Sequence, residues 1–117
     1  MISNWTEKPE IRMAKSEAFG RELLRHGTFG ADLIEFPPGG CVPRHTHEGN
    51  HILFCVAGDG RVTTDESEDL VKFGECYLIR SNQPHEIHAG EHGMRLLVVG
   101  DNCRDIGSED RLSVVEK

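Results

Sequence analysis

The sequence lacks long apolar runs, a surplus of positive charge and closely spaced cysteines. Its longest uninterrupted apolar run extends from Ile52 to Ala57, far short of the roughly 20 residues needed to span a bilayer. Acidic residues number 20 against 13 basic ones, for a formal charge of −7. Binding to nucleic-acid phosphates or to a membrane surface depends on Lys and Arg. We therefore expect neither nucleic acid nor a membrane as a partner.

The four cysteines form no C-x-x-C pair, which disfavours a zinc ribbon or a redox dithiol. They are Cys41, Cys55, Cys76 and Cys103. Cys55, inside the run ILFCVAG, is expected to be a small core residue, and Cys41 a loop residue. The N-terminus, MISNWTEKPEIRM, lacks the basic and then apolar order of a secretory signal. We therefore expect a cytoplasmic protein.

Short β-like runs dominate the chain and predict an all-β sandwich or barrel. Each run is bounded by Gly, Pro, Asn or Asp, and none has the periodicity of a convincing amphipathic helix. A length of 117 residues is typical of one domain. We expect residues 1–29 to form an arm and first strands that pack on a barrel core of residues 30–100. Residues 101–117 form a tail, in which 112–115 add an edge strand or a short helix.

Three histidines with even spacing indicate a metal site. His45, His47 and His51 precede the apolar run. Successive side chains of a strand point to opposite faces, so His45 and His47 project from the same side. His51 joins them if Gly49 and Asn50 turn or bulge the chain. His85 is a fourth candidate, provided the fold returns the chain to the first three.

A protease motif competes for the same residues. His47 to His51 satisfies H-E-x-x-H, which holds zinc only when it lies on a helix. Gly49 and Asn50 are poor helix formers, and the flanking residues favour strands. The strand interpretation is therefore preferred. By the same alternation His88 has opposite parity to His85 and is expected at the surface.

Two patterns in the chain resemble the two motifs of the cupins. Residues 39–58 read G-(x5)-H-x-H-(x3)-H-(x6)-G, similar to the first motif, which has Glu where this chain has His51. Residues 74–89 read G-(x5)-R-x-N-(x2)-H-(x3)-A, similar to the second motif, G-(x5)-P-x-G-(x2)-H-(x3)-N. Arg80, Asn82 and Ala89 thus replace the second motif's Pro, Gly and Asn. The resemblance covers about residues 30–100.

The resemblance implies a jelly-roll β-barrel and a metal held by His45, His47 and His85. With His51 in place of the glutamate, a four-histidine site resembling that of some cupin dioxygenases is expected. Small cupins commonly pair through edge strands, so the resemblance also implies a homodimer. The N-terminal arm and Trp5 are the candidate dimer contacts.

Two classes of function remain open on the sequence. The first is a metal-dependent enzyme, a dioxygenase-like oxidoreductase or an isomerase, acting on a small molecule in the barrel mouth. The second is a non-catalytic small-molecule-binding or regulatory module with a structural metal. The cofactor is one divalent transition metal (Fe, Ni, Zn or Mn), expected to dissociate below about pH 6 because its ligands must be neutral imidazoles. Strand parity gives the predicted pocket residues, which also suit an ordinary core: Leu53, Cys55, Tyr77 and Ile87.

Overall fold

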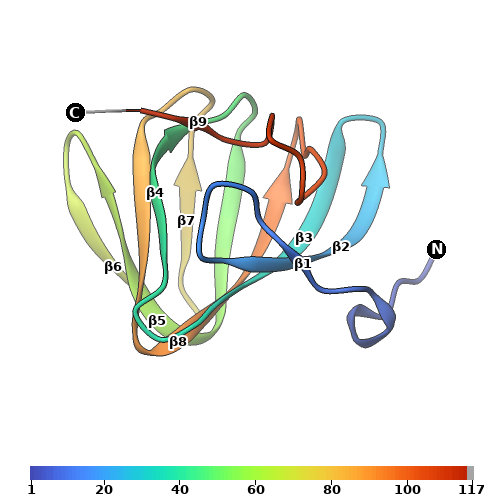
Figure 1. Ribbon diagram of the computed structural model, residues 1–117, viewed down its shortest axis with the longest axis horizontal. Helices are drawn as coiled ribbons and strands as arrows, with labels where there is room; N and C mark the ends of the chain where they lie inside the picture. The colour runs from blue at the N-terminus through green and yellow to red at the C-terminus, as the bar shows by residue number, and fades with distance from the viewer. Residues whose placement is uncertain (116–117) are drawn as a thin grey trace.

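The computed structural model describes residues 1–115 as one curled antiparallel sheet of nine strands (Figure 1). Residues 116 and 117, the last two of the predicted tail, lie outside the described part. A short 3-10 helix, η1 (Trp5–Glu7), precedes the sheet. The strands are β1 (Ile11–Arg12), β2 (Phe19–His26), β3 (Phe29–Phe36), β4 (Cys41–Thr46), β5 (His51–Thr64), β6 (Glu68–Lys72), β7 (Cys76–Ile79), β8 (His85–Gly100) and β9 (Ser113–Val114). The all-β prediction is confirmed.

The two longest strands, β5 and β8, run against each other over most of their length. Their pairing extends from His51 opposite Gly100 to Thr64 opposite His85. On its other edge β8 pairs first with β4 and then with β3, while β5 pairs with β7 and then with β6. Each half of β8 therefore lies between two neighbours, which curls the sheet towards a barrel.

The bend in this pair depends on glycine. The register shifts between Cys55 and Ala57 and again between Gly58 and Gly60. Gly58 has a φ of 70°, and a Cβ there would lie 2.1 Å from the carbonyl oxygen of Gly93. A side chain at this position would meet both a left-handed backbone and a backbone clash, so the strands approach closely here only because residue 58 is glycine.

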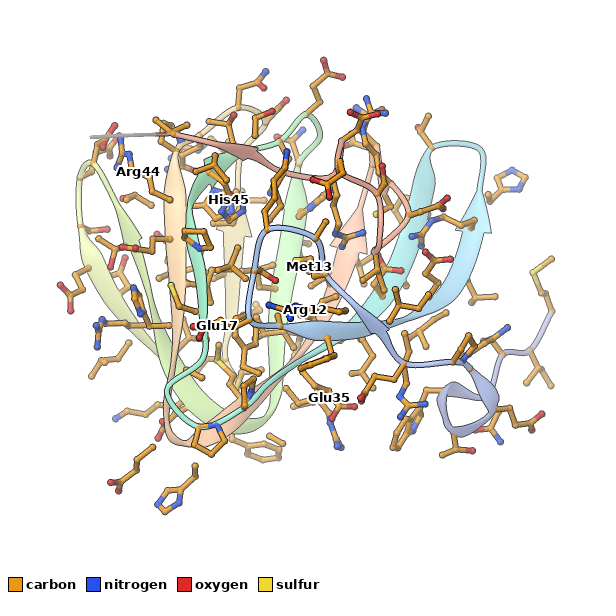
Figure 2. All side chains as sticks on the ribbon, viewed as in Figure 1. Arg12, Met13, Glu17, Glu35, Arg44 and His45 are labelled. Carbon is orange, nitrogen blue, oxygen red and sulfur yellow. The ribbon has the colours of Figure 1, made fainter. Side chains whose placement is uncertain are left out.

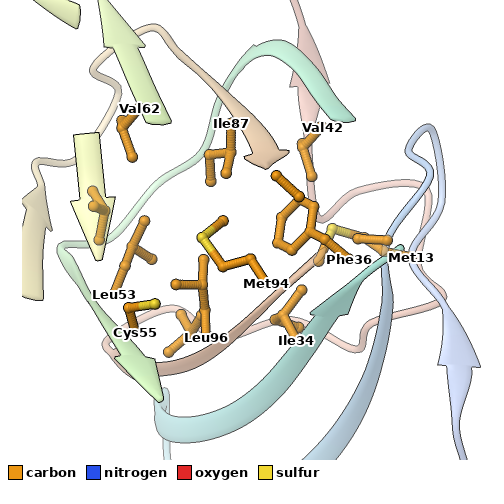
Figure 3. Packing of buried hydrophobic residues seen from close by; sticks show 14 of the residues in the cluster. Met13, Ile34, Phe36, Val42, Leu53, Cys55, Val62, Ile87, Met94 and Leu96 are labelled. Atoms are coloured by element: carbon orange, nitrogen blue, oxygen red, sulfur yellow. The ribbon is translucent and has the colours of Figure 1, made fainter. Parts of the chain in front are cut away.

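Alternate residues of the long strands fill the barrel (Figure 3). On β5, Leu53 and Cys55 are buried while Ile52 and Phe54 face outward. Cys55 is thus a core residue, as expected. On β8 the buried apolar residues are Ile87, Ala89, Met94, Leu96 and Val98. Among the described residues the buried polar side chains include His45 and His85, near the end at which β4 finishes, and also Asp32 on β3 and Thr64 on β5.

Both ends of the described chain pack on the barrel. The ring of Trp5 lies 5.6 Å from the guanidinium carbon of Arg21 and 5.1 Å from that of Arg95, a cation–π arrangement that holds the arm to β2 and β8. At the other end β9 pairs with β4 beside His45. The segment 112–115 is therefore an edge strand. No helix among the described residues is long and apolar enough to cross a membrane.

Ile79 should be a large contributor to stability. Its side chain is fully buried, whereas Leu70 is 70% exposed. We expect Ile79→Ala to lower the free energy of unfolding by about 2–5 kcal/mol, because it leaves a cavity in a packed interior. Leu70→Ala, the matched control, should change it by less than about 0.5 kcal/mol. Urea denaturation of both variants measures the difference, and equal effects would contradict the packing described here.

Candidate metal centre

Three histidines from two separated segments meet inside the barrel. His45 lies on β4 directly opposite His85 on β8, and His47 follows the end of β4. One ring nitrogen from each of the three lies within 4.8 Å of the other two. The ring centroids of His45 and His85 are 4.0 Å apart, and those of His47 and His85 are 4.9 Å apart. Figure 2 labels His45 near the end of β4, where the tail crosses the barrel.

The loop that carries His47 is fixed by the turn that precedes His85. The backbone N–H of Asn82 donates to the carbonyl of His47 (2.8 Å), and the N–H of Gly49 donates to Ser81 Oγ (2.9 Å). Asn82 has a φ of 61°, in the left-handed region that Asn tolerates better than most residues. Asn82, which stands where the second motif has glycine, therefore still adopts the backbone conformation of the turn. The replacement does not displace His85.

Hydrogen bonds to backbone carbonyls fix the tautomers of two of the histidines. Nδ1–H of His45 donates to the carbonyl of Pro43 (2.7 Å), and Nδ1–H of His85 donates to the carbonyl of Gln83 (2.7 Å). In a neutral ring this leaves Nε2 as the nitrogen with a free lone pair. Metal-binding histidines are typically oriented in this way. Nδ1 of His47 is buried and has no hydrogen-bond partner among the described residues.

Burial keeps these imidazoles neutral. Loss of hydration, with smaller contributions from the neighbouring His47 and Arg111, lowers the pKa of His45 to about 4. Burial is also the main cause that lowers the pKa of His47 and of His85 to about 3. Neutral rings are the form that binds metal. Proton competition for the ligands therefore begins at a lower pH than the value near 6 expected from unperturbed histidine.

His51 lies beside this group without being part of it. Its ring stacks on that of His47, with centroids 4.3 Å apart and an angle of 20° between the planes. Its Nε2–H donates to the carbonyl of Asp101 (2.8 Å). The nitrogen left with a free lone pair is consequently Nδ1. The His47 to His51 segment forms a loop and the start of β5, so the helix that H-E-x-x-H requires is absent there.

The histidines line a small, partly open cavity of about 50 Å³, enough for a few water molecules. Of the predicted pocket residues, Leu53 and Ile87 line it. The structure does not bring the other two to it, within the part of the chain that it describes. The Cys55 thiol points to the carbonyl oxygens of Ala57 and Gly58, and the Tyr77 hydroxyl donates to Asp69.

The sequence analysis missed a buried ion pair at the cavity wall. Asp32 is completely buried and contacts Arg111 at 3.0 Å and Arg25 at 2.7 Å. Two guanidinium groups therefore share one carboxylate, and Arg111 lines the cavity with Arg104 at its mouth. This arrangement leaves a positive charge near the histidines. No local pattern signals it, because Arg111 lies far along the chain from the β2–β3 hairpin that carries Arg25 and Asp32.

The metal-free protein should lose stability in mild acid. The pKa values of His45, His47 and His85 are lowered in the folded state relative to about 6.5 in an unfolded chain. Between about pH 6.5 and 4 the unfolded chain therefore binds more protons, and stability falls as pH falls. We expect the Tm of chelator-treated protein to fall over this range, and less steeply in His85→Gln. Equal slopes for the two proteins would contradict the burial of neutral imidazoles.

Comparison of the sequence and the fold with those of known proteins identifies the family. A sequence model of the cupin domain matches residues 32–100. No curated protein sequence matches the chain. Among solved structures, a predicted oxalate decarboxylase from Thermotoga maritima is similar at a TM-score of 0.78 and 21% identity, over 88% of this chain and 100% of that one.

Two further structures share the fold. An RmlC-like cupin from Shewanella frigidimarina has a TM-score of 0.79 and 16% identity, over 89% of this chain and 92% of its own. The polyketide cyclase RemF from Streptomyces resistomycificus has a TM-score of 0.74 and 23% identity, over 94% and 88%. Identities this low carry the fold and not the activity. The match over more than half of the sequence, on a curled β-barrel with clustered histidines, shows that this chain belongs to the cupin family.

Proposed function

We propose that this cupin is a metal-dependent enzyme that acts on a small molecule in the barrel mouth. The ligands are His45, His47 and His85. The observation that carries the proposal is the pair of carbonyl-bound Nδ1 atoms on His45 and His85. These two bonds leave Nε2 of His45 and of His85 free to bind a metal, and His47 has a buried Nδ1 without a partner among the described residues. The three neutral imidazoles together fit a transition-metal ion.

The donor set suits iron, nickel, zinc or manganese and carries no charge of its own. A divalent ion held by neutral imidazoles keeps its full charge and supplies Lewis-acid chemistry to an oxygen atom placed beside it. Three protein ligands leave positions open for substrate. A dioxygenase-like oxidation or an isomerisation is therefore the proposed reaction class.

The cavity walls favour a substrate with an anionic oxygen. Arg111 lines the cavity from the tail, as does Arg104, which is paired with Glu48 at 4.0 Å. Leu53, Ile87 and Leu96 supply apolar walls. Arg25 and Arg111 together carry one more positive charge than Asp32 neutralises. This excess charge attracts an anion towards the histidines. The apolar walls exclude water from the same space, which strengthens that attraction. Orientation of a carboxylate or an enolate is the proposed role of Arg111.

A non-catalytic binding module is the second candidate. The three-histidine group contains no carboxylate, so the ligands provide no general base. If His51 also binds the ion, a tetrahedral zinc site would have no open position and would be structural. Metal analysis of untagged protein, followed by oxygen uptake with diketones, phenols and thiols, separates the two. Substrate-dependent uptake supports the enzyme, whereas stoichiometric zinc without turnover supports the binding module.

Replacement of His47 should remove the interior metal. We expect His47→Ala to lose most of its bound ion and any turnover, because two neutral ligands hold a divalent ion much more weakly than three. His92→Ala is the matched control, since the His92 side chain is 81% exposed. Metal content by mass spectrometry and turnover give the readout. Unchanged metal content in His47→Ala would refute the assignment.

His51→Ala extends the same series to the predicted fourth ligand. Because its Nε2–H is engaged by Asp101, we expect this variant to keep the ion with an affinity lowered by about 10–100-fold, as for residues that orient ligands. Loss as complete as in His47→Ala would instead identify His51 as a ligand.

We also propose a cytoplasmic homodimer. All four cysteines are free, as expected for a reducing compartment. Trp5 packs on its own subunit, so the arm is a weaker candidate for the interface than the outer face of β5 and β7. There Ile52, Phe54 and Leu78 are 44%, 42% and 54% exposed, and Ile52 lies opposite Leu78 in the ladder. Contiguous apolar patches of this kind mark interfaces.

Leu78→Arg should convert the dimer to a monomer, because it places a charge within an apolar interface. Leu70→Arg, at a more exposed position on the separate β6 strand (70% against 54%), should leave the dimer intact. Sedimentation velocity of both variants gives the mass, and a monomeric wild-type protein would refute the dimer.

A further inference from the structure

We propose that Cys41, Glu86 and His88 form a second metal site, on the outer surface of the barrel, for a thiophilic divalent ion such as zinc or cobalt. Cys41 begins β4, and Glu86 and His88 lie on β8. One ligand atom from each of the three lies within 4.8 Å of the other two. Sulfur, nitrogen and oxygen donors together select a borderline transition metal over magnesium or calcium.

The sheet brings the three side chains to one face. Cys41 and His88 are direct partners across the β4–β8 ladder. Glu86 precedes His88 by two residues, so both project from the same side of β8. The intervening Ile87, like Val42 next to Cys41, lines the inner cavity. The second set of donors therefore lies across the sheet from the interior histidines.

The distances within the group match a tetrahedral site. Nε2 of His88 lies 3.7 Å from Cys41 Sγ and 3.3 Å from Glu86 Oε2. Zinc bonds of about 2.3 Å to sulfur and about 2.0–2.1 Å to nitrogen and oxygen, at tetrahedral angles, place these pairs about 3.6 and 3.4 Å apart. The same ring nitrogen thus faces both other donors, as a shared ion requires. Little movement is needed for binding.

The surroundings are negative, which favours a cation. Glu17 lies beside Cys41, whose backbone N–H donates to the Glu17 carboxylate at 3.0 Å; Figure 2 labels Glu17 close to β4. Burial, Glu86 and Glu17 raise the pKa of the Cys41 thiol, and the nearby Arg61 opposes them. A bound divalent ion deprotonates a coordinating thiol, so it outweighs the groups that raise the pKa of Cys41. Three protein ligands leave one position for water or an exogenous ligand.

Cobalt titration separates this site from the interior histidines. A thiolate bound to cobalt gives an ultraviolet charge-transfer band that an all-histidine site does not. We expect chelator-stripped, reduced wild-type protein without an affinity tag to develop this band, saturating by two equivalents because the interior histidines also take up cobalt. Cys41→Ser should abolish the band, and His88→Gln should at least weaken it. Cys76→Ser, which changes an exposed cysteine, should retain it.

The controls keep the two sites distinguishable. His47→Ala should keep the thiolate band, because its donors lie on the other side of the sheet. Circular dichroism of Cys41→Ser and His88→Gln confirms that each variant is folded. Absence of the band in the wild-type protein, or its persistence in Cys41→Ser, would overturn the second site and leave the interior one untouched.

Discussion

The antiparallel pairing of β5 with β8 is the constraint on which the rest of the structure depends. Their ladder joins His51 to Gly100 at one end and Thr64 to His85 at the other. Because β8 also pairs with β4, His85 is brought opposite His45. Each bend in this ladder requires close backbone contact, which Gly58 permits. The β4–β8 pairing then joins the two halves of the histidine group.

Polar groups within the barrel are tolerated because each has a specific partner. Burying an unsatisfied imidazole or carboxylate is costly. Carbonyl acceptors satisfy His45 and His85, and Arg111 with Arg25 neutralises Asp32. Within the histidine group, Nδ1 of His47 is the exception, since it is buried without a partner among the described residues.

Because successive side chains of β8 point to opposite faces of the sheet, residues 85–88 supply candidate metal ligands to both faces. His85 faces the interior among neutral donors, while Glu86 and His88 face outward beside Cys41. The expectation that His88 lies at the surface is consistent with its half-buried position there. Cys41 was expected in a loop, but it begins β4. Its role could not be read locally, because the residue that faces it comes 47 positions later in the chain.

The sequence by itself determined the all-β class and the alternation that buries Leu53 and Cys55, because these follow from periodicity. Motif spacing also singled out four histidines as candidate ligands, of which the structure brings His45, His47 and His85 within 4.8 Å of one another. The sequence was also compatible with the left-handed turn at position 82, because it has Asn there. Only the tertiary structure decided that His51 stacks on His47 and donates to Asp101, that Tyr77 lies away from the cavity, and that Asp32 joins Arg25 to Arg111. The contacts of His51 with Asp101 and of Asp32 with Arg111 join segments far apart in sequence. The contacts of His51 with His47 and of Tyr77 with Asp69 depend on how the intervening turns fold, which side-chain alternation does not encode.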